Sequence, residues 1–269
     1  METILADTSN SAIIEAIEAN TSALFALFKK WPRAEVHDSP ELLWTITDIP
    51  YPLFNSVLRA RLPTDAITEA IDETIARYKS RNVPMMWWIG PSTQPSNLGR
   101  LLAELGLQAS VSPGMAIDLN VLLESTQMPV DLKIKRVESK AELHSWSRVM
   151  TSVFGNPGFV AEAIFDLYLN LGLDIPCLNY IGTVEGEVVA TSSLYLGAGV
   201  AGMYNVTTKK SARRRGIGAA MTRVPLLEAR SFGYRIGTLH SSDSGFNVYR
   251  KLGFQEYCKI YQYIWRGDK

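Results

Sequence analysis

One short segment of this 269-residue chain has the residue types and spacing to bind an anion: Arg213, Arg214, Arg215, Gly216, Ile217 and Gly218. Two glycines let a backbone turn tightly, so that successive amides and the N-terminus of a following helix point at one anion. The arginines supply positive charge at the rim of such a turn. The segment therefore predicts a site for a phosphate or pyrophosphate group.

The elements expected around this segment have the order that such a site needs. Residues 201–206 have the β-branched and apolar character of a strand, and residues 219–230 carry apolar side chains at helical spacing. A second short strand is expected over 235–240, followed by a helix that ends at Gly253. The strand, the anion-binding turn and the helix form one coherent folding unit.

With these elements in place, the C-terminal half of the sequence resembles the GNAT acetyltransferase superfamily. The resemblance rests on Val206-Thr-Thr208, Arg213-x-x-Gly216-Ile-Gly218 and Tyr249-x-x-x-Gly253-Phe254. It implies an α/β (α+β) fold with a mixed, mostly antiparallel sheet flanked by helices, and acetyl-CoA as co-substrate without a metal. The residues implied to bind coenzyme A are Val206, Thr207, Thr208, Arg213, Arg214, Arg215, Gly216, Ile217, Gly218, Ala219 and Ser242.

Three positions depart from the family pattern. Lys210 stands where the family often has proline, and Ser242 stands where it often has asparagine. No glutamate precedes the turn on the strand, so the resemblance leaves the catalytic base unidentified.

Acyl transfer from a thioester needs a polarised carbonyl and a proton donor for the departing thiolate. The resemblance implies that the strand ending at Val206 splays from the strand ending near His240, which makes the Val206 amide the candidate donor to the thioester oxygen. Tyr249 is the candidate acid, because a phenol of pKa near 10 can protonate a thiolate of pKa near 8.5. The alternative for Tyr249 is a core tyrosine beside Phe254.

The attacking amine must lose a proton, because an alkylammonium of pKa near 10.4 is almost wholly protonated at neutral pH. His240 is the candidate base at the expected strand end, and Asp243 follows it. An ordered water that relays the proton to a glutamate or to backbone carbonyls fits equally well. His144 and His37 have less claim, because they lie farther from the expected site.

The first half of the chain reads as a degenerate copy of the second. Residues 102–107 echo 249–254, and residues 54–57 echo 204–206, in the same order. Leu102 replaces the tyrosine of the second copy.

This comparison predicts two tandem GNAT-like domains with a boundary near residue 128. The segment 59–66 contains no glycine, and residues 84–88 read as the strand that follows it. We therefore expect a degenerate domain without the coenzyme A loop over 1–128 and a catalytic domain over 129–269.

The predicted activity is transfer of an acetyl group from acetyl-CoA to a primary amine by direct attack. The acceptor loop is expected over 154–159, and a small amine, an amino acid derivative or a peptide N-terminus all fit it. Alternatives are a coenzyme A-binding sensor without turnover and an acyltransferase for longer acyl-CoA. The sequence argues against a nucleotide-binding protein, because the Walker pattern is absent and the G-x-G-x-x-G pattern is incomplete at Met221.

Composition narrows the classes of partner. Lys plus Arg and Asp plus Glu both number 27, so the whole chain has no charge excess to attract nucleic acid or an anionic membrane. No run approaches the roughly 20 apolar residues of a membrane span, and Ile13 to Phe28 reads as a core helix. Cys177 and Cys258 lie far apart without a metal-binding spacing, which fits a cytoplasmic protein. Homodimers are common among the enzymes that the sequence resembles, so the resemblance allows a homodimer.

Overall fold

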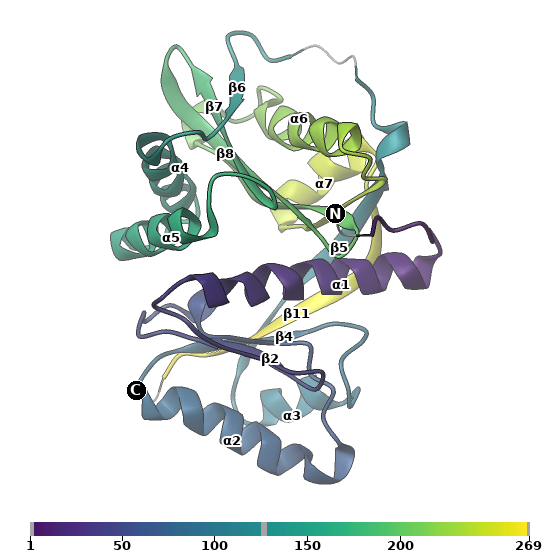
Figure 1. Cartoon of the computed structure of the whole chain (residues 1–269), viewed down its shortest axis with the longest axis vertical. Helices are drawn as coiled ribbons and strands as arrows, with labels where there is room; N and C mark the ends of the chain where they lie inside the picture. The colour runs from purple at the N-terminus through teal and green to yellow at the C-terminus, as the bar shows by residue number, and fades with distance from the viewer. Residues whose placement is uncertain (1–2, 125–127, 268–269) are drawn as a thin grey trace. The chain divides into compact units, whose positions relative to one another are not determined.

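The computed structural model describes residues 3–124 and 128–267. The chain forms two compact units, each made of two segments. Unit 1 comprises Met1–Asn20 and Gly114–Tyr257, and unit 2 comprises Thr21–Pro113 and Cys258–Lys269. Each unit is built around a sheet with helices packed on it (Figure 1).

In unit 1, the strands lie in the order β5-β10-β9-β8-β7-β6. Neighbouring strands are antiparallel except β9 and β10, which are parallel. The strands are β5 Gln108–Asp118, β6 Lys133–Arg136, β7 Cys177–Val184, β8 Glu187–Gly197, β9 Val200–Thr208 and β10 Ile236–His240, and the helices are α4 Lys140–Val153, α5 Gly158–Leu171, α6 Ile217–Ser231, α7 Asp243–Leu252 and the 3₁₀ turns η4 Leu119–Val121 and η5 Lys210–Ala212.

Strand β8 contacts helices α4 and α6. Leu194 and Leu196 pack in one hydrophobic core with Met221 and Leu226 of α6. On α4, the indole Nε1 of the buried Trp146 donates to the Ser192 carbonyl oxygen at 3.2 Å. Helices α4 and α6 thus both pack against β8 and β9.

In unit 2, the strands lie in the order β1-β2-β3-β4-β11. Its core includes the fully buried Trp87 and Tyr78, and Trp88 on the opposite face of β4 is half-buried. The strands are β1 Glu35–Asp38, β2 Leu43–Ile46, β3 Ser56–Leu58, β4 Met85–Ile89 and β11 Gln255–Trp265, and the helices are α2 Ile67–Ser80, α3 Leu98–Glu104 and the 3₁₀ turns η1 Leu27–Lys30, η2 Pro52–Phe54 and η3 Thr64–Ala66.

The two units are not the continuous ranges 1–128 and 129–269 expected from the sequence. Strand β5 follows α3 of unit 2, yet residues 114–118 pair with β10 of unit 1. Strand β11 follows α7 of unit 1, yet residues 261–265 pair with β4 of unit 2. Each half of the sequence therefore supplies one strand to the sheet of the other half, and we call this feature the strand exchange.

The echo between the two halves has a structural counterpart. Strand β3 is parallel to β4, as β9 is parallel to β10. The helix that follows each pair ends on a glycine with positive φ, 85° at Gly106 and 104° at Gly253. The amide of the residue after each glycine donates to a carbonyl oxygen five residues earlier. Leu107 donates to Leu102 at 3.1 Å, and Phe254 donates to Tyr249 at 3.0 Å. Leu102 and Tyr249 thus hold the same place in the same helix-ending motif.

Helix α1 (Asn10–Ala26) continues into η1, and together they span Asn10–Lys30. Within the described parts of the chain, this is the one helix long and apolar enough to cross a membrane, a test that a core helix also passes. Half of its apolar window is buried, and Ile17 and Phe28 are among its buried residues. These buried side chains match the expected core helix.

The other expected elements of the second half are confirmed. The predicted strand over 201–206 is β9, the helix over 219–230 is α6, and the strand over 235–240 is β10. Ahead of β9 along the chain come β6, α4, α5, β7 and β8. Just before the expected boundary near residue 128, Leu119–Val121 forms the turn η4, and residues 125–127 lie outside the described residues.

Candidate functional site

The anion-binding turn predicted from the sequence joins η5 to α6. Gly216 is the N-cap residue of α6, with φ 76° and ψ 1°, and no side chain caps the helix. The first amides of any helix lack acceptors within the helix, so those of Ile217, Gly218 and Ala219 are available to an anion. Arg214 also has a positive φ, 61°, which is uncommon for a residue other than glycine.

Gly218 is the second residue of α6, and the packing around it does not require a glycine. A Cβ atom added there would meet Thr208 Oγ1 at 3.8 Å, an ordinary van der Waals contact. Glycine destabilises a helix by about 1 kcal/mol relative to alanine. The bare Cα of Gly218 therefore keeps the approach to the helix N-terminus open at a cost to stability.

The arginines at this turn are exposed. The Arg213 Nε donates to the Thr208 carbonyl oxygen at 3.1 Å, and the Arg215 Nη2 donates to the Val130 carbonyl oxygen at 3.5 Å. These bonds hold two guanidinium groups at the rim of the turn.

Strands β9 and β10 separate beside this turn. Their parallel pairing ends at Met203 and Leu239, whereas β9 continues to Thr208. In the same region Asn205 and Val206 together face Ser192 of β8, because the register shifts between Tyr204 and Thr207. This β-bulge places Asn205 in the left-handed region, with φ 53°.

The Val206 amide faces the open edge of β9. The Lys209 amide donates to the Val189 carbonyl oxygen beside β8, at 2.8 Å. Backbone groups of successive strand residues alternate between the two edges, so Thr207 also faces β8, and Thr208 and Val206 face away from it. The bond from Arg213 to the Thr208 oxygen on that edge agrees with this alternation.

Several residues expected at the site have side chains that are occupied by other contacts or partly buried. The buried Thr207 hydroxyl lies 2.6 Å from the Thr191 hydroxyl, and the Ile217 side chain belongs to the core. Thr208 and Ala219 are half-buried. Ser242 is exposed and caps α7, where its hydroxyl accepts the Gly245 amide at 3.3 Å.

Tyr249 lies on α7 with its ring against the Cα of Gly245. A Cβ atom at Gly245 would come within 2.7 Å of the Tyr249 Cε2 atom, so only glycine leaves room for the ring in this place. Helical side chains lean toward the N-terminus of their helix, here toward Ser242. Burial raises the pKa of the phenol to about 12. The Tyr249 ring also packs on the ring of Phe254, with 5.8 Å between the ring centroids. Within the described residues, the Tyr249 hydroxyl has no hydrogen-bond partner in the protein.

His240 is half-buried at the end of β10 and pairs with Gly114 of β5. Burial lowers the pKa of its imidazole to about 4, so the ring is neutral at pH 7. The ordinary pKa that made His240 a suitable base is therefore not the one this site gives it.

Because of this lowered pKa, we expect thermal stability to fall as the pH is lowered from about 6.5 to about 4. In that window the histidine of the unfolded chain takes up a proton while the folded one stays neutral, which favours unfolding. Unfolding midpoints measured at pH 7, 5.5 and 4.5 should fall less steeply in His240→Gln. Equal slopes for the two proteins would show that the imidazole keeps an ordinary pKa.

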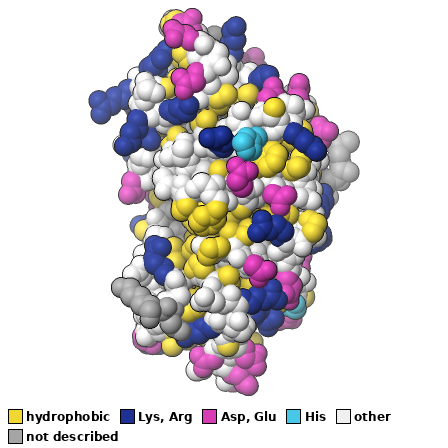
Figure 2. All heavy atoms as spheres, turned by 90° about the vertical axis from the view of Figure 1, so that its left-hand side faces the viewer, with side chains coloured by type: hydrophobic (Ala, Val, Ile, Leu, Met, Phe, Trp, Pro, Cys, Tyr) yellow, Lys and Arg dark blue, Asp and Glu magenta, His cyan; other side chains and the backbone are white. Residues whose placement is uncertain are grey.

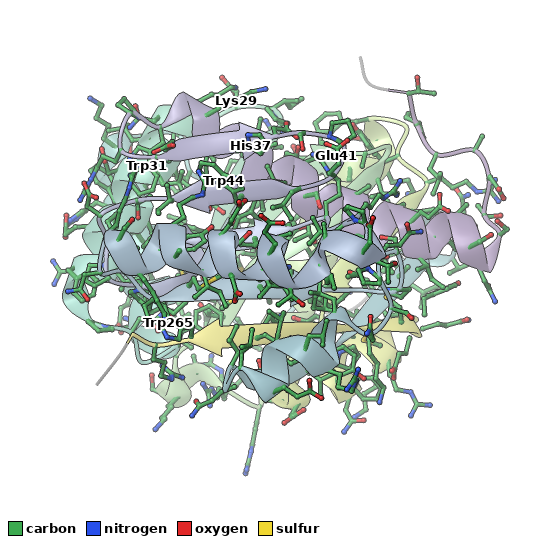
Figure 3. All side chains as sticks on the ribbon, turned by 90° about the horizontal axis from the view of Figure 1, so that it is seen from below. Lys29, Trp31, His37, Glu41, Trp44 and Trp265 are labelled. Carbon is green, nitrogen blue, oxygen red and sulfur yellow. The ribbon has the colours of Figure 1, made fainter. Side chains whose placement is uncertain are left out.

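The other two histidines have different surroundings. His144 lies 3.1 Å from Glu162 on the exposed surface of α4 and α5, a face where Figure 2 shows acidic and basic side chains interspersed. His37 belongs to unit 2, where its ring stacks on that of Trp44 with 5.4 Å between the ring centroids. Both residues are labelled in Figure 3. Both have structural partners of their own.

The expected acceptor loop joins α4 to α5. Phe154 and Phe159 at its ends are 55% and 45% exposed, so both rings present apolar surface to solvent. Gly155 turns the chain with φ 73°. These features fit an apolar wall on unit 1.

Asn205 is not among the residues expected from the sequence, and its side-chain Nδ2 donates to the Tyr168 hydroxyl of α5 at 3.0 Å. Asparagine is depleted in strands and enriched among residues with positive φ. An asparagine in the middle of a β-branched strand was the available signal for a bulge.

Comparison with solved structures identifies the fold. A GCN5-related N-acetyltransferase from Kribbella flavida aligns with a TM-score of 0.73 at 17% identity, over 94% of this chain and 96% of that one. A tandem GNAT protein from the clavulanic acid biosynthesis pathway aligns with a TM-score of 0.62 at 10% identity, over 100% of this chain and 98% of that one. The chain has a tandem GNAT fold.

A GCN5-related N-acetyltransferase from Sphaerobacter thermophilus shares this GNAT fold, with a TM-score of 0.61 at 17% identity over 94% of this chain and 91% of that one. No protein-family model and no curated protein sequence matches the chain. The predicted fold class, two GNAT-like modules with mostly antiparallel sheets, is confirmed. Among the residues that the structure describes, no group of three His, Cys, Asp or Glu side chains is placed to hold a metal ion.

Proposed function

We propose that this protein is an acyl-CoA-dependent N-acyltransferase that moves an acetyl group from acetyl-CoA to a primary amine. One observation carries the proposal: the turn from Gly216 to Gly218 opens the N-terminus of α6 to an anion. It does so beside the point where β9 and β10 part. That these two features occur together on a GNAT fold supports coenzyme A as the ligand.

In this proposal, the first amides of α6 and the rim arginines bind the pyrophosphate of coenzyme A. The exposed backbone edge of β9 binds the pantetheine arm, and the Val206 amide donates to the thioester oxygen. The amine nitrogen attacks the carbonyl carbon, the carbon–sulfur bond breaks, and the Tyr249 hydroxyl gives its proton to the sulfur. The Val206 amide thus stabilises the negative charge that develops on the thioester oxygen, and Tyr249 is the general acid.

The proton released by the amine has two routes. His240 is neutral at pH 7 and can accept it, but a pKa of about 4 makes the imidazole a weak base. An ordered water that passes the proton to solvent or to backbone carbonyls is the other route. This weak base also favours the second candidate function, a coenzyme A-binding sensor without turnover.

Unit 2 is, in this proposal, a degenerate GNAT-like module. In the corresponding segment, residues 59–66, two successive amides are bonded to backbone carbonyls. Arg61 donates to Glu41 at 2.7 Å, and Leu62 donates to Gln94 at 3.0 Å. Amides that already have acceptors offer little to a pyrophosphate.

Turnover is tested by screening primary amines with acetyl-CoA and following release of the free thiol. Small amines, amino acid derivatives and peptides with a free N-terminus form the first panel. Thiol release that depends on one of these amines supports the enzyme. Tight binding of acetyl-CoA without release by any of them would favour the sensor.

The contact between Gly245 and Tyr249 gives a separate prediction. Replacing Gly245 with alanine would drive the Cβ atom into the ring and displace the hydroxyl. We expect turnover to fall roughly tenfold to a hundredfold, because small displacements of reacting groups are costly, while the Kd for acetyl-CoA stays unchanged. Steady-state kinetics and calorimetry measure the two quantities.

Gly99→Ala is the matched control for Gly245→Ala. Gly99 is also a helical glycine, and a Cβ atom there would lie 2.7 Å from the Tyr263 hydroxyl in unit 2. The control has the same kind of clash and should keep full turnover. Equal losses in both variants would mean that the effect comes from general destabilisation.

A further inference from the structure

The bulge in β9 is held by a buried polar network. Asn205 Nδ2 donates to the Tyr168 hydroxyl at 3.0 Å and to the Ser193 hydroxyl at 3.2 Å. The Ser193 hydroxyl in turn donates to Asn179 Oδ1 at 2.7 Å. One side chain on β9 is thereby tied to α5, β8 and β7.

The backbone of Asn205 is fixed as well. Its carbonyl oxygen accepts the Thr191 hydroxyl at 3.0 Å. The φ of 53° is one that most residues adopt only at a cost, and asparagine tolerates it better than others. Side-chain and backbone bonds together select one conformation for the residue that precedes Val206.

The surroundings make these bonds strong. Asn179 and Ser193 are 2% and 4% exposed, and Tyr168 is 6% exposed. Burial also keeps the pKa of the Tyr168 phenol above its ordinary value, so its hydroxyl proton is retained. In a buried network a hydrogen bond is stronger than in water, and a lost partner is costly.

We propose that Asn205 is a positioning residue for acyl transfer. Its side-chain amide, held by Tyr168 and Ser193, fixes the left-handed turn that directs the Val206 amide to the open edge of β9. The network thereby sets how strongly the thioester carbonyl is polarised. The inference rests on the proposed function and extends it to residues outside the coenzyme A motif.

The test needs no acceptor amine. Acetyl-CoA carrying ¹³C at the thioester carbonyl is bound to the full chain, and its carbonyl stretch is measured by isotope-edited infrared difference spectroscopy. A hydrogen bond from Val206 should shift this band to lower wavenumber than in water. We expect Asn205→Ala to bind acetyl-CoA with a Kd within about twofold of the natural chain, since the anion-binding turn is intact, and to lose the shift.

Two further variants distinguish a positioning effect of the Asn205 side chain from a general loss of folding. Tyr168→Phe removes one hydroxyl and should reduce the shift. Asn205→Asp should restore it, because aspartate also tolerates positive φ and can accept from the Tyr168 and Ser193 hydroxyls. A flipped Asn179 amide can then donate to Ser193, since within the described residues its Nδ2 has no partner at present.

Asn82→Ala is the matched control. Asn82 is an exposed asparagine of unit 2 with φ 51°, so alanine there imposes the same backbone cost outside the network. This control should keep the full shift. A full shift in Asn205→Ala would overturn the inference, and so would binding without any shift in the natural chain. Failure of the natural chain to bind acetyl-CoA would instead overturn the proposed function, and the inference with it.

Discussion

Acetyl-CoA is expected to bind the chain one to one, and to lose at least about a hundredfold in affinity when Gly216 and Gly218 are both replaced by valine. A hundredfold corresponds to about 2.7 kcal/mol. Valine at Gly216 cannot easily hold the φ of 76°, and valine at Gly218 fills the space over the helix N-terminus. Isothermal titration calorimetry measures both affinities.

Two controls protect this result from misfolding. Gly218→Ala should fold at least as well as the natural chain, because its Cβ atom meets nothing closer than 3.8 Å and alanine favours a helix. It should still weaken binding. Gly186→Val imposes a comparable strain at a φ of 83°, in the turn between β7 and β8. It should bind normally. A natural chain that does not bind would reduce the segment to a basic surface turn.

Tyr249→Phe is expected to lower turnover by about 10² to 10⁴ while the Kd for acetyl-CoA stays within about twofold. General acid catalysis by a positioned side chain contributes a factor of this size. Phenylalanine keeps the packing on Gly245 and Phe254, so only the proton donor is lost. Kinetics with an accepted amine and calorimetry with acetyl-CoA separate the two quantities.

The pKa of Tyr249 adds a second readout to this prediction. With a pKa of about 12, the phenol stays protonated across the working range, so its ionisation should not lower the rate below about pH 11. Tyr261→Phe, a change at an exposed tyrosine of unit 2, should leave turnover unchanged. Unchanged turnover in Tyr249→Phe would make Tyr249 a core residue.

The sequence predicted the part of the fold whose signals are local. Glycine at Gly216 and Gly253 marks a turn and a helix end through backbone conformation alone, and both glycines have positive φ in the structure. Helical and strand periodicity located α6, β9 and β10. These signals depend on neighbours within a few residues.

What the sequence did not predict depends on contacts between distant residues. The low pKa of His240 follows from burial, which no local pattern encodes. The Thr207 hydroxyl faces Thr191, a residue sixteen positions earlier, because the bulge resets the alternation of β9. The division near residue 128 failed to match the units, since strand pairing and not chain order decides which sheet a strand joins.

The strand exchange also determines how this protein can be divided. A chain cut at residue 128 would leave each fragment without one strand of its sheet, β5 for the C-terminal fragment and β11 for the N-terminal one. An unpaired sheet edge recruits another strand, so isolated fragments are prone to self-association. When the folded chain is cleaved at this position, the two fragments should instead remain associated, because each fragment still supplies a strand to the sheet of the other. Each module therefore depends on a strand from the other half of the sequence, so neither is expected to fold completely when the chain is divided at residue 128.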